Sequence, residues 1–427
     1  MLSSCQWLPR EDIKRLQDAA LADIVLHAWR SVPFYRDRLA PLMRGDGTVD
    51  LTAWAQVPCL TRRDLQDNFD DLKSTSCPAS HGAVRLAKSS GSTAEPVGVL
   101  TTNFCDVGSS VANARGMDWA KVDYSLNQAQ IKPVGESAAP YPGKQIDASW
   151  APYWLDGAAS GNWHLLDHTT AHNLQLEWLA KRGRCYLNTM PSNAAEIARR
   201  VALEPALKPD LAGIMTLGEI VTDDLRTHVR EHLGCEVWDS YSTEEFGCLA
   251  WQCPQGTNLH IADELVLLEV IDDMTGKPCG PGETGSVIIT SFFNQAMPQI
   301  RYKLGDLATV GPPCACGRGL TSLASIVGRR RQLFRFPNGD TVMPGLATKL
   351  FDEFLHARKW QAAQISGQTI EIRFVSDVPE DQQDRAAFVD AANRRFQQKL
   401  TYVFRQVDAI ATQPSGKFFE YVCELPE

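Results

Sequence analysis

One stretch decides how this sequence is interpreted, and it reads Gln299-Ile300-Arg301-Tyr302-Lys303-Leu304-Gly305-Asp306-Leu307. A hydrophobic β-type segment runs into Arg-Tyr and then into a Gly-Asp corner. The Asp306 carboxylate stays ionised near neutral pH and accepts two hydrogen bonds at once, so a vicinal diol such as that of a ribose is a natural partner. Because Gly-Asp is also an ordinary turn sequence, the choice between a turn and a binding residue depends on the rest of the chain.

Composition and charge argue against several classes of protein. The chain has 427 residues, 44% hydrophobic and 22% charged, which is typical of a globular protein with one large domain and one smaller domain. The formal net charge is −9, and no dense basic run occurs beyond Arg329-Arg330-Arg331. We therefore expect neither nucleic acid nor a membrane as a partner.

The first residues and the cysteines predict a cytoplasmic protein. Residues 1–5 lack the charged and apolar regions of a signal peptide, and Glu11 and Asp12 follow soon after. No apolar run approaches the length of a bilayer span. Twelve cysteines in a chain of this length do not form a dense secreted framework, so we expect reduced thiols with a metal site among them.

The distribution of apolar residues predicts an α/β fold in two domains. A helical apolar stripe covers residues 11–40 and ends at Val32-Pro33, and β-type runs alternate with helix-type runs from about 80 to 310. A helix is expected to start at Asn193. Composition shifts after Gly328, so we expect a large layered N-terminal domain over residues 1–328 and a small mobile α+β lid domain over residues 329–427. Further expected elements are strands at 265–271, 286–293 and 369–375, a hairpin turn within 334–340, and helices near 346–357 and 379–400.

A loop of small hydroxylated residues is suited to phosphate binding. It follows a short β-type run and precedes another, so its backbone N–H groups and hydroxyls can face phosphate oxygens. It lacks the Gly-Lys-Ser/Thr ending of a Walker loop, and a surface turn is the alternative. The residues of this hydroxylated loop are Ser89, Ser90, Gly91, Ser92 and Thr93.

Two further segments are suited to the same chemistry. Tyr241 is followed by Glu244 and Glu245 at the end of a β-type run, where a ring can stack on a base and an acid can hold a divalent cation. A capped helix start is the alternative there. Lys417 follows a Pro-Ser-Gly turn, where a mobile lysine suits charge that develops on a phosphorus centre, and a solvated surface lysine is the alternative.

Taken in order, these motifs resemble those of the adenylate-forming superfamily of acyl-CoA synthetases, peptide-synthetase adenylation domains and luciferases. The run from His27 to Tyr35 and the segment from Glu264 to Asp306 are most similar to the phenylacetate-CoA ligase-like branch. The resemblance extends over nearly the whole chain, to Lys417. Its motifs are Ser-Ser-Gly-Ser-Thr, Gly-Glu, Tyr-x-x-x-Glu, Arg-Tyr-x-x-Gly-Asp-Leu, Gly-Arg and Pro-Ser-Gly-Lys.

The resemblance implies how ATP would be bound. The hydroxylated loop would wrap the phosphates. Gly218 and Glu219 would line the adenine pocket, and Tyr241 would stack on the base. Asp306 would bind the ribose hydroxyls, with Arg329 near them.

The resemblance also implies the reaction. A carboxylate would attack the α-phosphate of ATP and release pyrophosphate, and the acyl group would then pass to CoA. Glu245 would hold Mg²⁺ and Lys417 would stabilise the transition state. Chemistry of this kind depends on positioning and charge neutralisation more than on a protein nucleophile.

Some positions depart from the family pattern. They replace the usual Gly-Lys pair after the hydroxylated loop, the usual Gly after the tyrosine, a hydroxyl residue before the metal-binding acid, and a hinge acid. Because Asp306 and Lys417 are retained, we expect adenylation to be retained, whereas the second half-reaction stays open. The departing positions are Ala94, Glu95, Ser242, Glu244 and Arg331.

Two short clusters of soft ligands predict a structural zinc site. Cys253 and His260 form one cluster, and Cys314 and Cys316 form the other. Thiolates and imidazole in this combination suit tetrahedral Zn²⁺, and relatives in the same branch often carry such a site. Cys248 is a fifth candidate, and a set of free thiols is the alternative.

The expected function is that of an AMP-forming ligase for a small aromatic acid. Residues 119–178 are rich in Trp and Tyr and can line a pocket for a planar acid, although we expect most of these rings in the core. CoA is the expected acceptor. An amine, a carrier-protein thiol, or nitrite adenylation for diazotisation of an aryl amine in secondary metabolism are the alternatives. A non-catalytic nucleotide sensor is an alternative of another class, and a homodimer is left open.

Overall fold

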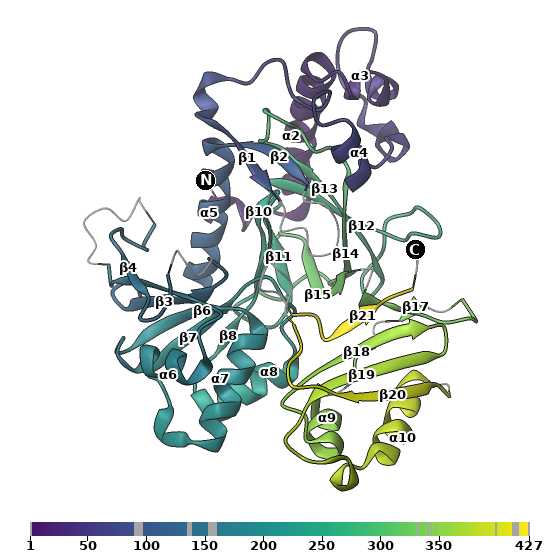
Figure 1. Ribbon diagram of the computed structural model, residues 1–427. Coiled ribbons are helices and arrows are strands. Elements are labelled where there is room, and N and C mark those ends of the chain that lie inside the picture. The colour runs from purple at the N-terminus through teal and green to yellow at the C-terminus, as the bar shows by residue number, and fades with distance from the viewer. Residues whose placement is uncertain are drawn as a thin grey trace. The chain divides into compact units, whose positions relative to one another are not determined.

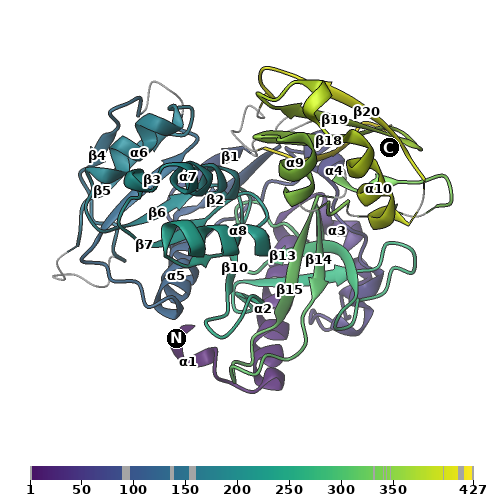
Figure 2. The ribbon, with the colours of Figure 1, turned by 90° about the horizontal axis from the view of Figure 1, so that it is seen from below.

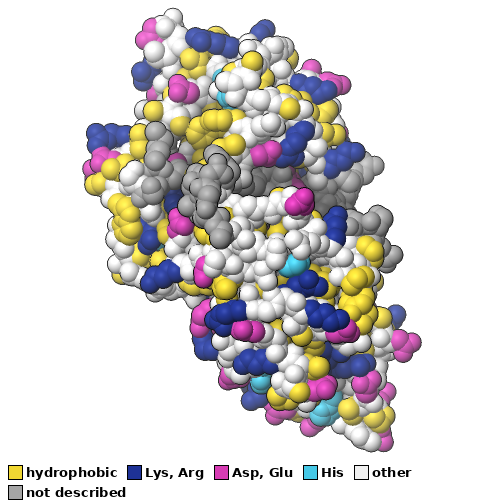
Figure 3. Space-filling model, turned by 90° about the vertical axis from the view of Figure 1, so that its left-hand side faces the viewer, with side chains coloured by type: hydrophobic (Ala, Val, Ile, Leu, Met, Phe, Trp, Pro, Cys, Tyr) yellow, Lys and Arg dark blue, Asp and Glu magenta, His cyan; other side chains and the backbone are white. Residues whose placement is uncertain are grey.

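The computed structural model describes residues 2–88, 97–134, 139–152, 160–329, 332–339, 341–342, 344–346, 348–397, 399–411 and 418–425. The chain divides into two compact units, Met1–Ile326 and Val327–Glu427, which are treated separately. Within the described ranges, no helix is both long enough and apolar enough to cross a membrane. On the face shown in Figure 3, Lys and Arg side chains are interspersed with Asp and Glu side chains.

A six-stranded sheet forms one half of the first unit (Figure 1). Its order is β4-β5-β3-β6-β7-β8, and every neighbouring pair is parallel except β4–β5. The chain passes from β3 to β5 on one side and then to β6 on the other, so the strand order reverses at β3. In open α/β sheets, ligands bind outside the carboxyl ends of the strands at such a reversal. The strands are β3 (Asn127–Lys132), β4 (Lys144–Ile146), β5 (Trp163–Asp167), β6 (Cys185–Thr189), β7 (Leu211–Thr216) and β8 (Val237–Trp238).

Helices cover both faces of this sheet. Helices α6, α7 and α8 bury one face, where Ile197 packs in a cluster with Leu187. Helix α5 reaches the other face, where Trp119 packs in a cluster with Tyr186. Tyr186 and Leu187 are consecutive in β6 and therefore point to opposite faces. The helices are α5 (Asn103–Trp119), α6 (His172–Ala180), α7 (Pro191–Leu203) and α8 (Asp223–His228), visible in Figures 1 and 2.

A seven-stranded sheet forms the other half of the first unit, with the order β12-β13-β14-β15-β11-β10-β9. The pairs β9–β10, β10–β11, β11–β15, β12–β13 and β13–β14 are antiparallel. The strands expected at 265–271 and 286–293 correspond to β12 and β13. The strands are β9 (Ser240–Thr243), β10 (Gly247–Gln252), β11 (Leu259–Ile261), β12 (Val266–Ile271), β13 (Thr284–Ser291), β14 (Tyr302–Val310) and β15 (Ser322–Arg329).

The first long helix packs in one apolar cluster with the start of β14. Helix α2 (Arg10–Ser31) is shorter than the expected span of 11–40, because Pro33 disfavours helical geometry in the residue before it. The Tyr35 hydroxyl accepts the backbone N–H of Ile300 at 3.1 Å and donates to the carbonyl of Pro298 at 3.0 Å. The N-terminal segment therefore fixes the chain that leads into β14. Shorter elements of this unit are α1 (Leu2–Cys5), α3 (Tyr35–Arg38), α4 (Arg62–Asp67), β1 (Val84–Lys88) and β2 (Gly98–Thr102).

A bulge in β14 sets the position of Asp306. The pairing with β13 shifts between Lys303 and Leu307, so that three residues of β14 lie opposite one residue of β13. Gly305 has a φ of 88°, with open space around the position of a Cβ atom, so backbone conformation rather than crowding favours glycine there. The Gly-Asp corner is therefore a bulge inside a strand and not a chain reversal.

Helix α7 begins earlier than the sequence predicted. It starts at Pro191, which suits a first helical position because no N–H is needed there. Asn193, the expected start, lies buried in the first turn, and its Nδ2 donates to Gln175 Oε1 and Thr189 Oγ1, both at 3.0 Å. The prediction was wrong because tertiary partners take the amide group that would otherwise have capped the helix.

The second unit is a small α+β structure around a four-stranded sheet with the order β20-β19-β18-β21. The pair β18–β19 is antiparallel, and β19–β20 and β18–β21 are parallel. Phe351 stacks on Trp360 in the core with 3.6 Å between ring centroids. The expected hairpin within 334–340 and strand at 369–375 are confirmed. The elements are β16 (Phe334–Arg335), β17 (Thr341–Val342), α9 (Thr348–Leu355), β18 (Lys359–Ser366), β19 (Thr369–Val375), α10 (Arg385–Phe396), β20 (Thr401–Gln406) and β21 (Tyr421–Cys423).

Candidate functional site

The seven-stranded sheet brings Tyr241 and Asp306 together. The hydroxyl of Tyr241, on β9, donates a hydrogen bond of 2.7 Å to Oδ2 of Asp306, on β14. Both residues are buried, with 7% and 8% of their surface exposed. An aromatic ring and an acidic group are thus fixed beside each other, although they are far apart in the sequence. This pair can present a flat apolar face and a hydrogen-bond acceptor to one ligand.

Arg301 anchors the backbone just before this pair. It is a non-glycine residue with a φ of 51°, and its side chain is buried. The guanidinium donates to the carbonyls of Ala55 and Val57 at 3.2 and 2.8 Å and lies 3.3 Å from a carboxylate oxygen of Glu269. In the sequence, the Arg-Tyr pair is the end of a β segment and part of the Arg-Tyr-x-x-Gly-Asp-Leu motif, and neither interpretation assigns Arg301 a role. The structural role of Arg301 was missed, because nothing local in the sequence indicates its partners.

The carboxyl ends of the parallel strands supply further polar groups. Gly218, with a φ of 78°, and Glu219 follow β7 after one intervening residue, Leu217. One carboxylate oxygen of Glu219 accepts the backbone N–H of Ser192 at 2.9 Å, in the first turn of α7. An acid at a helix N-terminus is stabilised by the partial positive charge there. Glu219 is thereby held at the sheet edge where ligands bind in folds of this kind.

The segment after Tyr241 is a turn between two strands. Thr243 ends β9, its hydroxyl accepts the backbone N–H of Phe246 at 3.1 Å, and β10 begins at Gly247. Glu244 is exposed and Glu245 is partly buried on this turn. The alternative of a capped helix start is therefore wrong. A turn at a sheet edge leaves carboxylate oxygens in a position to meet a cation.

Several predicted site residues cannot be placed against these groups. Arg329 ends β15 and belongs to the second unit, where its backbone N–H donates to Oε1 of Gln332 at 2.7 Å. The remaining positions lie outside the described residues, namely Ser89, Ser90, Gly91, Ser92, Thr93, Ala94, Glu95, Arg331 and Lys417.

The four predicted soft ligands converge on one point. The Sγ atoms of Cys253, Cys314 and Cys316 and a ring nitrogen of His260 all lie within 4.8 Å of one another. Cys253 and Cys314 are 3.6 Å apart at sulfur, and His260 Nε2 is 3.2 Å from Cys316 Sγ. Two sulfur ligands of one tetrahedral zinc ion lie roughly 3.8 Å apart, so the spacing fits the ion. Cys248, the fifth candidate, is buried but is not part of this group.

The surroundings favour the metal-binding forms of His260 and Cys316 but not that of Cys253. Burial lowers the pKa of His260 to about 4, so the imidazole is neutral at physiological pH and has a lone pair to donate. Burial disfavours the thiolate of Cys316, but hydrogen bonds from the backbone and side chain of Arg318 outweigh it and lower the pKa. Burial raises the pKa of Cys253 to about 12, so a metal would have to displace that proton.

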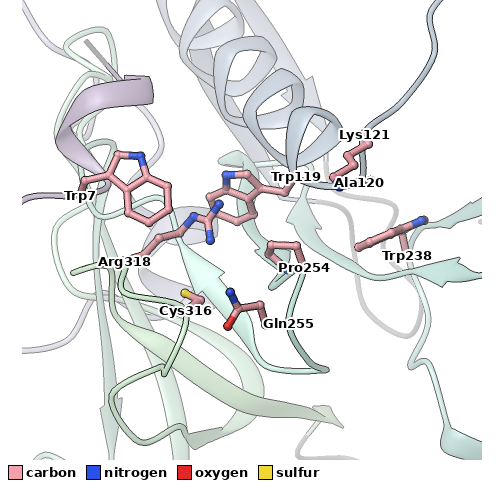
Figure 4. A pocket seen from close by; sticks show the side chains of 9 residues that line it. All are labelled: Trp7, Trp119, Ala120, Lys121, Trp238, Pro254, Gln255, Cys316 and Arg318. Atoms are coloured by element: carbon pink, nitrogen blue, oxygen red, sulfur yellow. The ribbon is translucent and has the colours of Figure 1, made fainter.

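A cavity of about 480 Å³ borders the same group (Figure 4). The guanidinium of Arg318 lies between the rings of Trp7 and Trp119, 4.5 and 4.6 Å from their centroids. Trp238 and Lys121 line the end opposite Trp7 (Figure 4). The cavity is lined by Cys316 and not by Asp306, so it is separate from the Tyr241–Asp306 pair.

The aromatic residues at 119–178 pack mostly in the core, as expected. Trp178 is 1% exposed and Trp150 is 8% exposed, and each lies in an apolar cluster. Among the described aromatic residues of that segment, only Trp119 lines the cavity. Tyr153 and Trp154 lie outside the part of the chain that the structure describes.

Comparison with known proteins identifies similarities to ligases, although no protein-family model matches the chain. The chain is 26% identical over 330 residues to the phenylacetate-coenzyme A ligase of Thermus thermophilus, covering 75% of this chain and 71% of that protein. It is 25% identical over 361 residues to the phenylacetate-coenzyme A ligase of Escherichia coli, covering 81% and 77%. A crystal structure of 2-hydroxyisobutyryl-CoA ligase in complex with 2-HIB-AMP shares the fold, with a TM-score of 0.73, 16% identity, and coverage of 96% and 88%.

The fold and these similarities define the class of protein, which is an ATP-dependent, AMP-forming ligase. The sequence is similar to phenylacetate-CoA ligases, and the fold is that of a solved adenylate-bound CoA ligase, in agreement with the resemblance that the motifs indicated.

Proposed function

We propose that this protein adenylates a small aromatic carboxylic acid with ATP and Mg²⁺ and then passes the acyl group to CoA. The hydrogen bond between Tyr241 and Asp306 carries the proposal. It joins a ring that can stack on a base to a carboxylate that can accept from a ribose diol. The similarity to phenylacetate-CoA ligases supports an aromatic acid and CoA as the other substrates.

The nucleotide would lie along the carboxyl edge of the six-stranded sheet. We assign the ribose hydroxyls to Asp306 and the base to Tyr241. Gly218 and Glu219 would line the adenine pocket, since both lie in the segment just after β7 at that edge. Arg329 would lie near the ribose, and the hydroxylated loop would enclose the phosphates.

The reaction would proceed in two displacements. An oxygen of the acid attacks the α-phosphorus of ATP, the bond to the bridging oxygen breaks, and pyrophosphate leaves. The thiol of CoA then attacks the acyl carbon and AMP leaves. Glu245 would hold the Mg²⁺ that offsets the phosphate charge, and Lys417 would stabilise the charge that develops at phosphorus.

We also propose that the Cys/His group holds a structural zinc ion. Its four members come from the segment after β10, from β11, and from the loop between β14 and β15. A shared ion would tie these segments together and brace the loop that follows β14, the strand of Asp306. The guanidinium of Arg318 beside Cys316 would balance the excess negative charge of three thiolates around one divalent ion.

Pyrophosphate release tests the proposal directly. Purified protein with ATP and Mg²⁺ would be supplied with a panel of aryl acids, each with and without CoA. We expect acid-dependent release of pyrophosphate and a CoA thioester as product. Absence of release with every acid would refute the ligase activity. Release without a thioester would refute only CoA as the acceptor, and parallel reactions with amines, a carrier protein and nitrite would then identify the alternative.

A lysine variant tests the assigned catalytic residue. Lys417→Ala is expected to abolish adenylation while leaving ATP binding nearly unchanged, because the lysine would act on the transition state and not on the bound nucleotide. Lys399→Ala, at an exposed lysine of the second unit, is the matched control. Unchanged turnover in Lys417→Ala would contradict the assigned role.

A further inference from the structure

Lys132 stands at the point where the strand order of the six-stranded sheet reverses. It is the last residue of β3. Its strand neighbours are Asp167, paired with it at the end of β5, and Thr189, at the end of β6 beside Ile131. Parallel strands bring their carboxyl ends to one edge, and a reversal of strand order leaves room for a ligand at that edge. Lys132 is therefore placed where a substrate would lie.

The polar groups at this edge are mostly acids. Within the described residues, Lys132 is the one lysine or arginine that ends or directly follows any of the parallel strands β3, β5, β6, β7 and β8. ATP and the acid substrate are both anions, so a site that holds them beside these protein carboxylates needs positive charge. The acids that end these strands, follow them, or lie on the adjoining β9–β10 turn are Asp167, Glu219, Asp239, Glu244 and Glu245.

The ammonium of Lys132 has no close carboxylate partner in the described part of the chain. No ion pair within 4.0 Å among the described residues involves it. Burial lowers the pKa of Lys132, and the negative charge of Glu244 partly opposes this effect. Asp167, its neighbour across the strands, instead accepts hydrogen bonds from Thr169 and from the backbone N–H of Val134. The side chain is partly buried, so an anion bound there would be only weakly screened by water.

Other cations near this edge are already engaged. Arg85, on which Glu244 also acts, forms an ion pair with Asp106. Arg226, from α8, donates to the carbonyl of Val237 at 2.7 Å and offsets the charge of Asp239. Among the described residues that end or directly follow these parallel strands, Lys132 is thus the cation left for a ligand.

We propose that the ammonium of Lys132 binds the reacting oxyanion of the acid substrate, which is the carboxylate of an aryl acid. This inference rests on the proposed adenylation. The carboxylate has to approach the negatively charged α-phosphate past several protein carboxylates, and a partly buried ammonium offsets that repulsion. Lys132 is then a substrate-binding residue that selects a small oxyanion.

Steady-state kinetics separate this role from nucleotide binding. Phenylacetate is the probe acid, and the variants are Lys132→Met, which keeps the length of the apolar stem, and Lys132→Arg, which keeps the charge. We expect Lys132→Met to raise the KM for phenylacetate about 10- to 150-fold, the effect of losing one charge-assisted hydrogen bond, with the KM for ATP within about twofold. Lys132→Arg should recover part of the loss. Lys144→Met, at an exposed lysine of β4 in the same sheet, is the matched control.

The outcomes distinguish this inference from the proposed function. If the wild type is active and Lys132→Met has an unchanged KM for phenylacetate, the role of Lys132 alone is overturned. Equal increases in the KM for phenylacetate and for ATP would also overturn it, because they would indicate a general structural effect. No pyrophosphate release by the wild type with phenylacetate, the other aryl acids or sodium nitrite would overturn the proposed function and this role together. If the wild type releases pyrophosphate with nitrite alone and Lys132→Met does not, the oxyanion site is supported and its assignment to an aryl acid is overturned.

Discussion

The assignment of Asp306 to a ribose leads to a prediction that depends on one oxygen atom. Asp306→Asn keeps the size of the side chain and one carbonyl oxygen but removes the negative charge and one acceptor. The buried neighbour stays satisfied, because the new amide nitrogen can donate to the hydroxyl oxygen of Tyr241, which lies 2.7 Å from Oδ2. The substitution should therefore act on the ligand more than on the fold.

The expected magnitude follows from the hydrogen bonds that the carboxylate would make to the diol. Each hydrogen bond to a charged group contributes about 1.5–3 kcal/mol. Loss of one such bond weakens binding about 10- to 150-fold, since every 1.4 kcal/mol is a factor of ten. A nucleotide without ribose hydroxyls has no such bond to lose.

Calorimetric titration with ATP and with 2′,3′-dideoxy-ATP measures this difference. We expect Asp306→Asn to bind ATP about 10- to 150-fold more weakly than the wild type and to bind 2′,3′-dideoxy-ATP with unchanged affinity. Tyr241→Phe is the matched variant, because it removes the donor and leaves the carboxylate. Equal losses for the two nucleotides in Asp306→Asn would refute a ribose contact and indicate a general effect on the pocket.

Three further predictions concern the framework around the site. We expect the wild type to hold about one zinc ion per chain. Cys314→Ser should abolish this binding, as measured by elemental analysis, whereas Cys77→Ser should retain it. Arg301→Met should lower the free energy of unfolding in urea by about 3–5 kcal/mol, because it leaves the largely buried carboxylate of Glu269 without its arginine partner; a loss below about 1 kcal/mol would contradict this. Burial raises the pKa of Asp239 to about 6, so its contribution to stability is present below pH 4 and is lost as the pH rises through 6. Asp239→Asn should accordingly be more stable than the wild type at pH 7, by about 3 kcal/mol, with no difference below pH 4, as measured by urea midpoints across this range.

Local patterns predicted the regular elements better than their ends. The strand at 369–375 and the hairpin within 334–340 follow from alternation of apolar residues and from turn chemistry, which act between close neighbours. The start of α7 was missed because Asn193 bonds to side chains on other elements. Capping rules describe only the competition within a few residues.

For the candidate site, the sequence alone determined which residue types are present and in what order. The order of motifs from the hydroxylated loop to Lys417 was enough to indicate the superfamily, and the grouping of Cys253, His260, Cys314 and Cys316 followed from ligand chemistry. These inferences need no coordinates, because they concern composition, order and spacing along one chain.

Only the tertiary structure decided how these residues meet. Asp306 reaches Tyr241 because a bulge at Gly305 shifts the register of β14, and Arg301 supports that strand through carbonyls and a carboxylate from distant segments. The role that we propose for Lys132 depends on the strand order, which places this residue among acids from several strands. Such relations depend on pairing between residues far apart in the chain, and no short-range pattern in the sequence encodes them.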